Sequence, residues 1–169
     1  MPGVELWVLH LVRDPRGMAW SWQKQLRQPG PTGRALPRHR PEASALRWDA
    51  YNLFAERLLR PRLGPRYHLV RYEDLVDDPA RALGSVLSWL GDPCDALPLV
   101  GDPPALALHR PQHQVWGNPV RTSTGTLPIT LDDEWRRAMP AGDRLVATAV
   151  ALPFLHHYGY ELWPTPVTR

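Results

Sequence analysis

An arginine and a serine near the N-terminus have the types and the spacing of an anion-binding pair. Arg13 follows an apolar run, and Ser21 comes eight positions later, with Gly17 between them. Residues a little over two helical turns apart face broadly the same side, so the guanidinium and the hydroxyl could donate hydrogen bonds to one phosphate. The ordinary alternative is a surface arginine that pairs with Asp14 and a serine that faces solvent. The spacing alone favours this alternative.

A strand end and a helix start are the elements that would position these residues. Residues 4–12 are almost all apolar, with β-branched and aromatic members, which predicts a buried strand in a parallel sheet. Asp14 and Pro15 suit the N-cap and the first position of a helix, predicted over residues 15–28. Ligands of open α/β sheets bind beyond the carboxyl ends of the strands, and a helix N-terminus favours anions.

The rest of the chain predicts several helices and one more short strand. The strand is expected at residues 67–72, and the helices at residues 42–59, 79–90, 132–139 and 143–157. The apolar face of the 42–59 helix is expected at Leu46, Ala50, Leu53 and Leu58. Residues 92–128 are expected to be irregular. The alternation of strands and helices predicts one α/β domain over residues 1–169.

A basic stretch separates the first two predicted helices. Residues 15–41 contain no Asp or Glu but six cations, namely Arg16, Lys24, Arg27, Arg34, Arg38 and Arg40. Such a stretch is either a solvated loop or a basic lid over an anionic ligand.

Composition excludes several classes of protein. One cysteine in 169 residues cannot form an internal disulfide, which fits the reducing cytoplasm. No apolar run approaches the ~18 residues of a membrane span, and no secretory signal is visible, so we expect no membrane partner. The net charge of +3, with acids interspersed among the arginines, disfavours a nucleic-acid module. His109 and His113 have no evident third ligand, so no metal is expected.

Four segments together resemble the sulfotransferases that use 3′-phosphoadenosine 5′-phosphosulfate (PAPS). They are Leu11-Val12-Arg13-Asp14-Pro15-Arg16 with Ser21, Val70-Arg71-Tyr72-Glu73-Asp74-Leu75-Val76 with Pro79, His113-Gln114-Val115-Trp116-Gly117-Asn118-Pro119-Val120-Arg121, and the closing residues Asp133, Trp135 and Tyr158-Gly159-Tyr160. Each segment is a weak or moderate signal, but the four occur in the family's order over nearly the whole chain.

The resemblance implies a role for each matching position. Arg13 and Ser21 would bind the 3′-phosphate of PAPS, Tyr72 would lie near the adenine, and Arg121 would reach the 3′-phosphate from a closing loop. Glu73 and Asp74 are expected in a solvated turn. In the full-length form, the implied reaction moves a sulfuryl group from PAPS to a hydroxyl or amine of a small molecule, glycan or peptide. The catalytic base stays unassigned.

One family element has no counterpart in this sequence. The loop that cradles the 5′-phosphosulfate precedes the Arg-Asp-Pro segment in the family, but only twelve residues precede Arg13 here. We therefore expect an incomplete P-loop-like three-layer fold, with a parallel sheet, flanking helices and a truncated N-terminus. The alternative function is a catalytically inactive remnant that binds the nucleotide. A sheet edge exposed by truncation would favour homo-oligomers.

Overall fold

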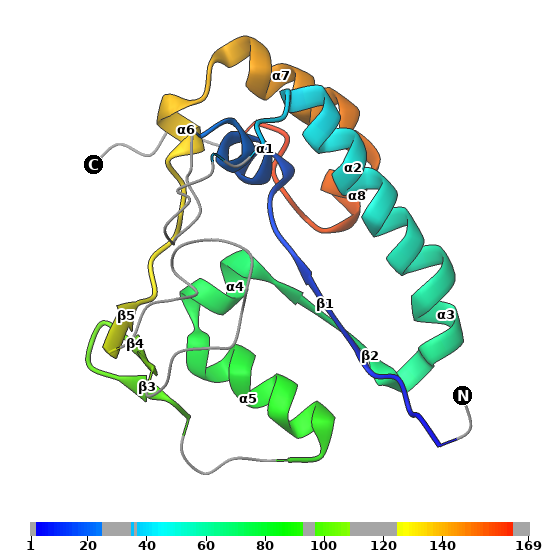
Figure 1. The fold of residues 1–169 in the computed structure, drawn as a ribbon, viewed down its shortest axis with the longest axis vertical. Coiled ribbons are helices and arrows are strands. Elements are labelled where there is room, and N and C mark those ends of the chain that lie inside the picture. Colours follow the sequence, from blue (N-terminus) through cyan, green and yellow to red (C-terminus); the bar gives the residue numbers. More distant parts are fainter. Residues whose placement is uncertain (1–2, 25–34, 36, 93–96, 109–124, 164–169) are drawn as a thin grey trace. The chain divides into compact units, whose positions relative to one another are not determined.

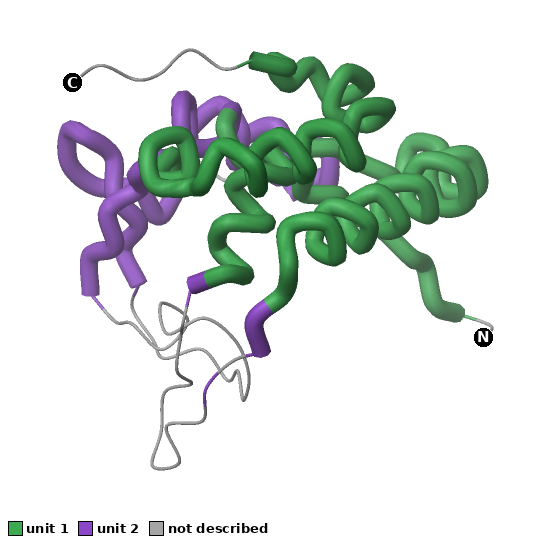
Figure 2. Tube along the Cα trace, turned by 90° about the horizontal axis from the view of Figure 1, so that it is seen from above, with its two compact units in different colours: residues 1–23, 39–73, 132–169 green, residues 24–38, 74–131 purple. Residues whose placement is uncertain are grey.

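The computed structural model describes residues 3–24, 35, 37–92, 97–108 and 125–163 (Figure 1). These residues form two compact units (Figure 2). Unit 1 comprises Met1–Gln23, His39–Glu73 and Asp132–Arg169, and unit 2 comprises Lys24–Arg38 and Asp74–Leu131.

Unit 1 contains the predicted parallel sheet. Strand β1 (Val8–Val12) pairs in parallel with β2 (Tyr67–Arg71), in a register that runs from Val8 opposite Tyr67 to Val12 opposite Arg71. The expectation that the first strand is buried is wrong for one of its faces. Leu9 and Leu11 are 48% and 53% exposed, because side chains alternate between the two faces of the sheet and these two point away from the face that packs in the core of unit 1.

Helix α1 (Pro15–Gln23) begins where the sequence predicts it. Asp14 caps it, since its Oδ1 accepts a hydrogen bond from the backbone N–H of Arg16 at 2.9 Å, and Pro15 occupies the first helical position. The predicted continuation over residues 25–28 lies outside the described residues.

Helix α2 (Pro41–Phe54) forms as predicted, but its expected apolar face is wrong. Leu46, Leu53 and Leu58 are between 43% and 59% exposed. The buried side carries Ser44, Ala45, Trp48, Asn52 and Ala55. Small side chains allow α1 and α7 (Ala141–Val150) to pack closely on α2, with Trp48 as the one large apolar contact, and a count of apolar residues does not detect such a face.

The long helix continues beyond α2 through a wider turn. A π-helical segment, η1 (Ala55–Leu59), is followed by α3 (Arg60–Leu63) and a short 3-10 turn, η2 (Gly64–Arg66). Pro61 has no N–H to donate and its ring crowds the carbonyl four positions back, which accounts for the widening in this segment. Here Glu56 accepts hydrogen bonds from Arg60 at 2.8 Å and from the Tyr158 hydroxyl at 3.2 Å. Burial alone would raise the pKa of Glu56, but these contacts hold it below its ordinary value.

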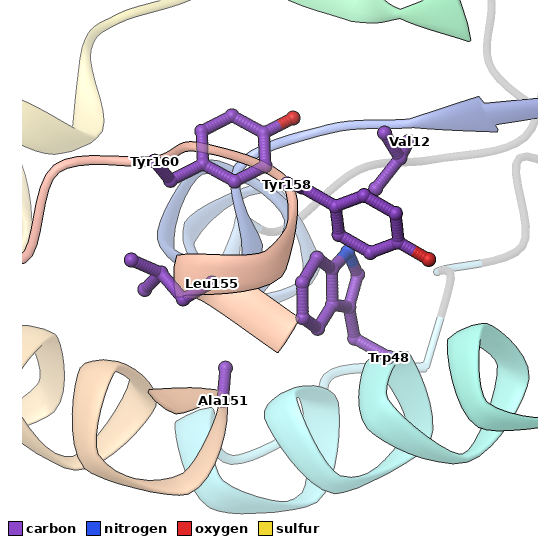
Figure 3. Close-up of a cluster of buried hydrophobic side chains, with 6 residues drawn as sticks. All are labelled: Val12, Trp48, Ala151, Leu155, Tyr158 and Tyr160. Atoms are coloured by element: carbon purple, nitrogen blue, oxygen red, sulfur yellow. The ribbon is translucent and has the colours of Figure 1, made fainter. Parts of the chain in front are cut away.

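Two clusters of buried side chains hold unit 1 together. The first joins β1 and α2 to the C-terminal helix α8 (Leu152–His157) through Val12, Trp48, Ala151, Leu155, Tyr158 and Tyr160 (Figure 3). The second joins α1, α2 and α7 to helix α6 (Trp135–Ala138) through Ala19, Ala45, Trp135, Met139 and Ala147. His10 lies on the inner face of β1, where its Nδ1 is hydrogen-bonded to the Tyr67 hydroxyl.

The helix expected at residues 143–157 is divided into two helices near Pro153. The predicted 132–139 helix is shorter than expected, because only α6 forms there. Helix α7 ends at Val150, and α8 begins at Leu152 with Pro153 in its first turn. The described residues include no helix that is both long and apolar enough to cross a bilayer.

Unit 2 contains a predicted helix and an unexpected small sheet. Helix α4 (Tyr72–Asp77) leads from unit 1 into α5 (Pro79–Leu90), which Asp78 caps and Gly91 ends with a φ of 75°. The expectation that residues 92–128 are irregular is wrong for three short strands. They form an antiparallel sheet of β3 (Leu99–Val100), β4 (Ala105–Leu108) and β5 (Gly125–Pro128). Strands of two to four residues are too short for an alternating pattern to reveal them.

Candidate functional site

Arg13 stands where β1 ends and α1 begins, and its backbone is fixed from two sides. Val12 before it is 2% exposed, within the first core cluster. The indole Nε1 of Trp48 donates a hydrogen bond to the Arg13 carbonyl at 3.0 Å. The strand end is therefore held against α2. The position of the Arg13 side chain is set by separate contacts.

The guanidinium of Arg13 lies between Tyr72 and Asp132. Its central carbon is 4.8 Å from the centre of the Tyr72 ring. Its Nη2 donates to the main-chain oxygen of Asp132 at 2.9 Å and pairs with the carboxylate Oδ2 at 3.0 Å. The backbone N–H of Asp132 donates in turn to the Tyr72 hydroxyl at 3.3 Å. The structure thus brings together two of the predicted site residues, Arg13 and Tyr72, and adds Asp132.

The alternative that pairs Arg13 with Asp14 is wrong. Asp14 pairs with Arg16 instead, at 2.6 Å, and both side chains are buried. Arg16 Nη1 and Nη2 also donate to the backbone oxygens of Leu162 and Glu161, at 3.0 and 2.8 Å. Arg16 therefore takes no part in a basic lid. It fastens the start of α1 to the C-terminal segment.

Gly17 makes room for the Arg13 side chain on α1. A Cβ at this position would lie 3.2 Å from Nε and Nη2 of Arg13 and 3.1 Å from the ring of Trp135. Because these distances are tighter than ordinary van der Waals contact, any other residue at position 17 would displace the guanidinium or the indole. The absence of a side chain here is what allows Arg13 to lie across the first turns of α1.

Ser21 lies on α1 one turn beyond Gly17, on the same side of the helix. Its side chain is partly buried. Its hydroxyl makes no hydrogen bond with any residue that the structure describes. The shared ligand of Ser21 and Arg13 stays a prediction. The third predicted phosphate-binding residue, Arg121, lies outside the described residues.

Glu73 is a structural link, so the expectation of a solvated turn is wrong for it. It lies in α4, where its Oε1 accepts from the backbone N–H of Asp14 at 3.0 Å and its Oε2 from the Tyr160 hydroxyl at 2.8 Å. Burial, reinforced by the Glu73 carboxylate, raises the pKa of Tyr160, so this phenol remains a hydrogen-bond donor at neutral pH. The guanidinium of Arg71 covers the Tyr160 ring at 4.6 Å.

Sequence reasoning missed the residues that hold the site in shape. The Tyr158-Gly159-Tyr160 segment contributed to the family resemblance, but the sequence assigned no role to Tyr160. Asp132, Arg16 and Glu73 act through partners between 59 and 146 positions away, and no local spacing predicts such contacts.

The arrangement suits the binding of a phosphate oxygen or a similar anion. Nη2 of Arg13 is engaged by Asp132, while Nε and Nη1 donate to no described residue, so each can offer a hydrogen bond to an anion from its own edge of the guanidinium. The Arg13 side chain is 24% exposed, so a ligand can reach it. The N-terminus of α1 adds a partial positive charge on the same side of β1.

Comparison with known proteins identifies the family to which the chain belongs. A family model described as the sulfotransferase domain matches residues 5–104, a range that contains Arg13, Ser21 and Tyr72. No curated protein matches the chain, and neither does any solved structure. Because the matched range covers more than half of the 169 residues, the chain belongs to the sulfotransferase family.

Proposed function

We propose that Arg13, Ser21 and Tyr72 bind the 3′-phosphate end of PAPS, and that the chain serves the transfer of its sulfuryl group to a hydroxyl or amine. The observation that carries this proposal is the Arg13 guanidinium, held over Tyr72 with two nitrogens available. A phosphate monoester presents the oxygens that such a planar donor fits best.

Each proposed contact has a separate chemical role. Arg13 supplies charge and a hydrogen-bond donor, and Ser21 supplies one hydroxyl from the same side of α1. Tyr72 gives one ring face to Arg13, and the adenosine is proposed to lie beside the same tyrosine. Arg121 is proposed from the sequence as a second cation on the same phosphate.

The proposed reaction exchanges one bond to sulfur for another. The bond between the sulfur and the 5′-phosphate oxygen breaks, and a bond from the sulfur to the acceptor oxygen or nitrogen forms. The acceptor releases one proton, and adenosine 3′,5′-bisphosphate leaves. We propose a small molecule, a glycan or a peptide as the acceptor. The second candidate function is binding of the nucleotide without turnover, and the same contacts support it.

Calorimetric titration of two nucleotides tests the assignment of the 3′-phosphate. Charge-assisted hydrogen bonds contribute roughly 1.5–3 kcal/mol, so Arg13→Ala should weaken adenosine 3′,5′-bisphosphate by about tenfold or more. Adenosine 5′-phosphate should bind almost as before, because it lacks the group that Arg13 contacts. Ser21→Ala should show the same pattern with a smaller loss. Arg57→Ala, on the exposed side of the long helix, is the matched control and should change neither ligand.

The results separate the possible failures. Equal losses for both nucleotides in Arg13→Ala would mean that Arg13 acts through folding or general charge, and the assignment would be withdrawn. A transfer assay from PAPS to phenols, sugars and amines then decides between the two functions. Transfer that depends on the protein supports the transferase. Binding of the bisphosphate without transfer supports the binding function.

A further inference from the structure

Asn52 on α2 is a buried polar residue with one unsatisfied atom. Its side chain is 3% exposed, and its Nδ2 donates to the Trp48 carbonyl at 2.7 Å. Its Oδ1 is buried as well, but it meets no donor with ordinary hydrogen-bond geometry among the described residues. Because nearly all buried polar atoms in folded proteins have a partner, this acceptor calls for a nearby donor.

The imidazole of His10 lies beside Asn52 and can supply that donor. Burial lowers the pKa of His10, and the adjacent Asn52 side chain and the Glu56 carboxylate raise it in part. Nδ1 of His10 is hydrogen-bonded to the Tyr67 hydroxyl. Burial raises the pKa of Tyr67 to about 12, so the phenol keeps its proton and can donate it to Nδ1. A neutral imidazole that accepts at Nδ1 carries its own proton on Nε2, the nitrogen left for Asn52.

Two contacts join His10 to Trp48, whose indole donates to the Arg13 carbonyl. The first passes through Asn52, which is bonded to the Trp48 carbonyl one helical turn earlier. The second passes through Tyr158, whose ring lies edge-on to His10 at 6.0 Å and to Trp48 at 5.8 Å (Figure 3). These four side chains, His10, Asn52, Tyr158 and Trp48, form a network that leads from a titratable group to the backbone of Arg13.

We propose that neutral His10 is a positioning residue for Arg13 and acts through this network. The inference rests on the proposed role of Arg13 in binding the 3′-phosphate. Nε2 of His10 donates to Oδ1 of Asn52, which holds the Asn52 and Trp48 side chains against the end of β1. The indole of Trp48 then keeps the Arg13 backbone in the position from which its guanidinium meets the phosphate.

Protonation of His10 opposes this arrangement. The groups that face His10 are Tyr67 from β2, Asn52 from α2, Glu56 from η1 and Tyr158 after α8. Of these, Glu56 is the charged one, and its carboxylate is already bound by Arg60 and Tyr158, with His157 at 3.7 Å. A protonated Nδ1 is a donor, so the Tyr67 hydroxyl can no longer donate to it. Acidification therefore favours a state in which His10 reaches water and the contact between β1 and α2 loosens.

Nuclear magnetic resonance tests the network without a nucleotide. At about pH 8, the nitrogen shifts of the His10 imidazole should place its proton on Nε2. As the pH falls, the indole N–H signal of Trp48 should shift with the same midpoint as His10. His10→Gln, whose amide donates and accepts but does not titrate, should remove this midpoint from the Trp48 signal. His156→Gln, on the exposed side of α8, is the matched control and should leave it in place.

Calorimetric titration tests the effect on the anion site. Each pH compares the wild type with His10→Gln, because the nucleotide phosphate also titrates near about pH 6. Both should bind adenosine 3′,5′-bisphosphate equally at about pH 8, and at about pH 5 the wild type should bind about fivefold more weakly, at the low end of coupling between linked sites. Adenosine 5′-phosphate should show no such difference. By linkage, bound bisphosphate should lower the pKa of His10, whereas direct attraction to the phosphate would raise it.

The outcomes separate this proposal from the proposed function. A Trp48 signal that does not follow the titration of His10 would overturn it, and the wild type alone supplies this result, however the variant folds. So would a pKa of His10 that bound bisphosphate raises or leaves unchanged, or a loss of affinity at low pH that is as large in His10→Gln. Failure of the proposed function has a different signature. The wild type would bind both nucleotides alike at about pH 8, while the Trp48 signal still followed His10.

Discussion

Removing the charge of Asp132 should strengthen the binding of adenosine 3′,5′-bisphosphate. Asp132 holds Nη2 of Arg13 through both its carboxylate and its main-chain oxygen. The variant Asp132→Asn keeps the main-chain hydrogen bond, and its amide oxygen can still accept from Nη2. The change therefore preserves the position of the guanidinium while it removes a negative charge beside the proposed phosphate.

The size of the effect follows from the geometry. A phosphate that accepts from Nη1 is separated from the Asp132 carboxylate, which pairs with Nη2, by the width of the guanidinium, so the two charges are roughly 7 Å apart. In a water-like dielectric, that distance gives about 0.6 kcal/mol of repulsion for each negative charge on the phosphate. Because the Asp132 side chain is 38% exposed, the water-like value applies. For a dianionic phosphate we expect binding about five- to tenfold tighter at low salt, and a gain of about twofold at physiological ionic strength.

Calorimetric titration at two salt concentrations measures this gain. Adenosine 5′-phosphate should change much less, and Asp133→Asn should have little effect, because Asp133 is directed to Arg137 instead. A loss of bisphosphate affinity in Asp132→Asn, as large as that in Arg13→Ala, would refute the reasoning. It would mean that the carboxylate positions Arg13 and that its charge is secondary.

Two further variants test the interior of unit 1 by thermal and denaturant unfolding. Arg16→Met leaves the buried Asp14 carboxylate without its partner, so the free energy of unfolding should fall by about 3–5 kcal/mol, whereas the exposed control Arg57→Met should stay within about 0.5 kcal/mol of the wild type. A small effect of Arg16→Met would contradict the buried pair. Asp49→Asn should raise stability at pH 7, since burial raises the pKa of Asp49 from 3.8 to about 6 and favours the neutral carboxyl in the folded state. The wild type therefore loses stability as the pH rises from about 4 to about 6. The gain from Asn should be about 1 kcal/mol above that window, reduced because the carboxyl is partly exposed, and absent below it. An equal gain at pH 3 would show that the charge is not its cause.

The start of the chain was predictable because its signals are local. Asp14 and Pro15 specify the beginning of α1 by backbone chemistry, and the apolar run before them specifies β1. The parallel pairing of β1 with β2 also follows, since the helical segments between them provide the crossover that parallel strands need. These features depend on neighbouring residues and not on the rest of the fold.

The face of α2 was not predictable in the same way. Its two sides both carry apolar residues, and the sequence cannot say which side α1 and α7 will cover. The structure buries Ala45 and Trp48 and leaves Leu46 and Leu53 exposed, because small residues let the helices approach closely. The choice between two apolar sides depends on the shape of the partner helices. The spacing of apolar residues within α2 gives no information about that shape.

The proposed anion site depends on segments both inside and outside the matched family range. Arg13 and Tyr72 lie within residues 5–104, but the residue that fixes the Arg13 guanidinium, Asp132, lies beyond it. The start of α1 is held in the same way, through Arg16 to Glu161 and Leu162. The end of β1 fixes only the backbone of Arg13. The direction of its side chain is set by Asp132, which lies far along the sequence. The segments that flank the C-terminal helices, at Asp132 and at Glu161 and Leu162, are therefore part of the phosphate-binding site that we propose, although no catalytic group is assigned to them.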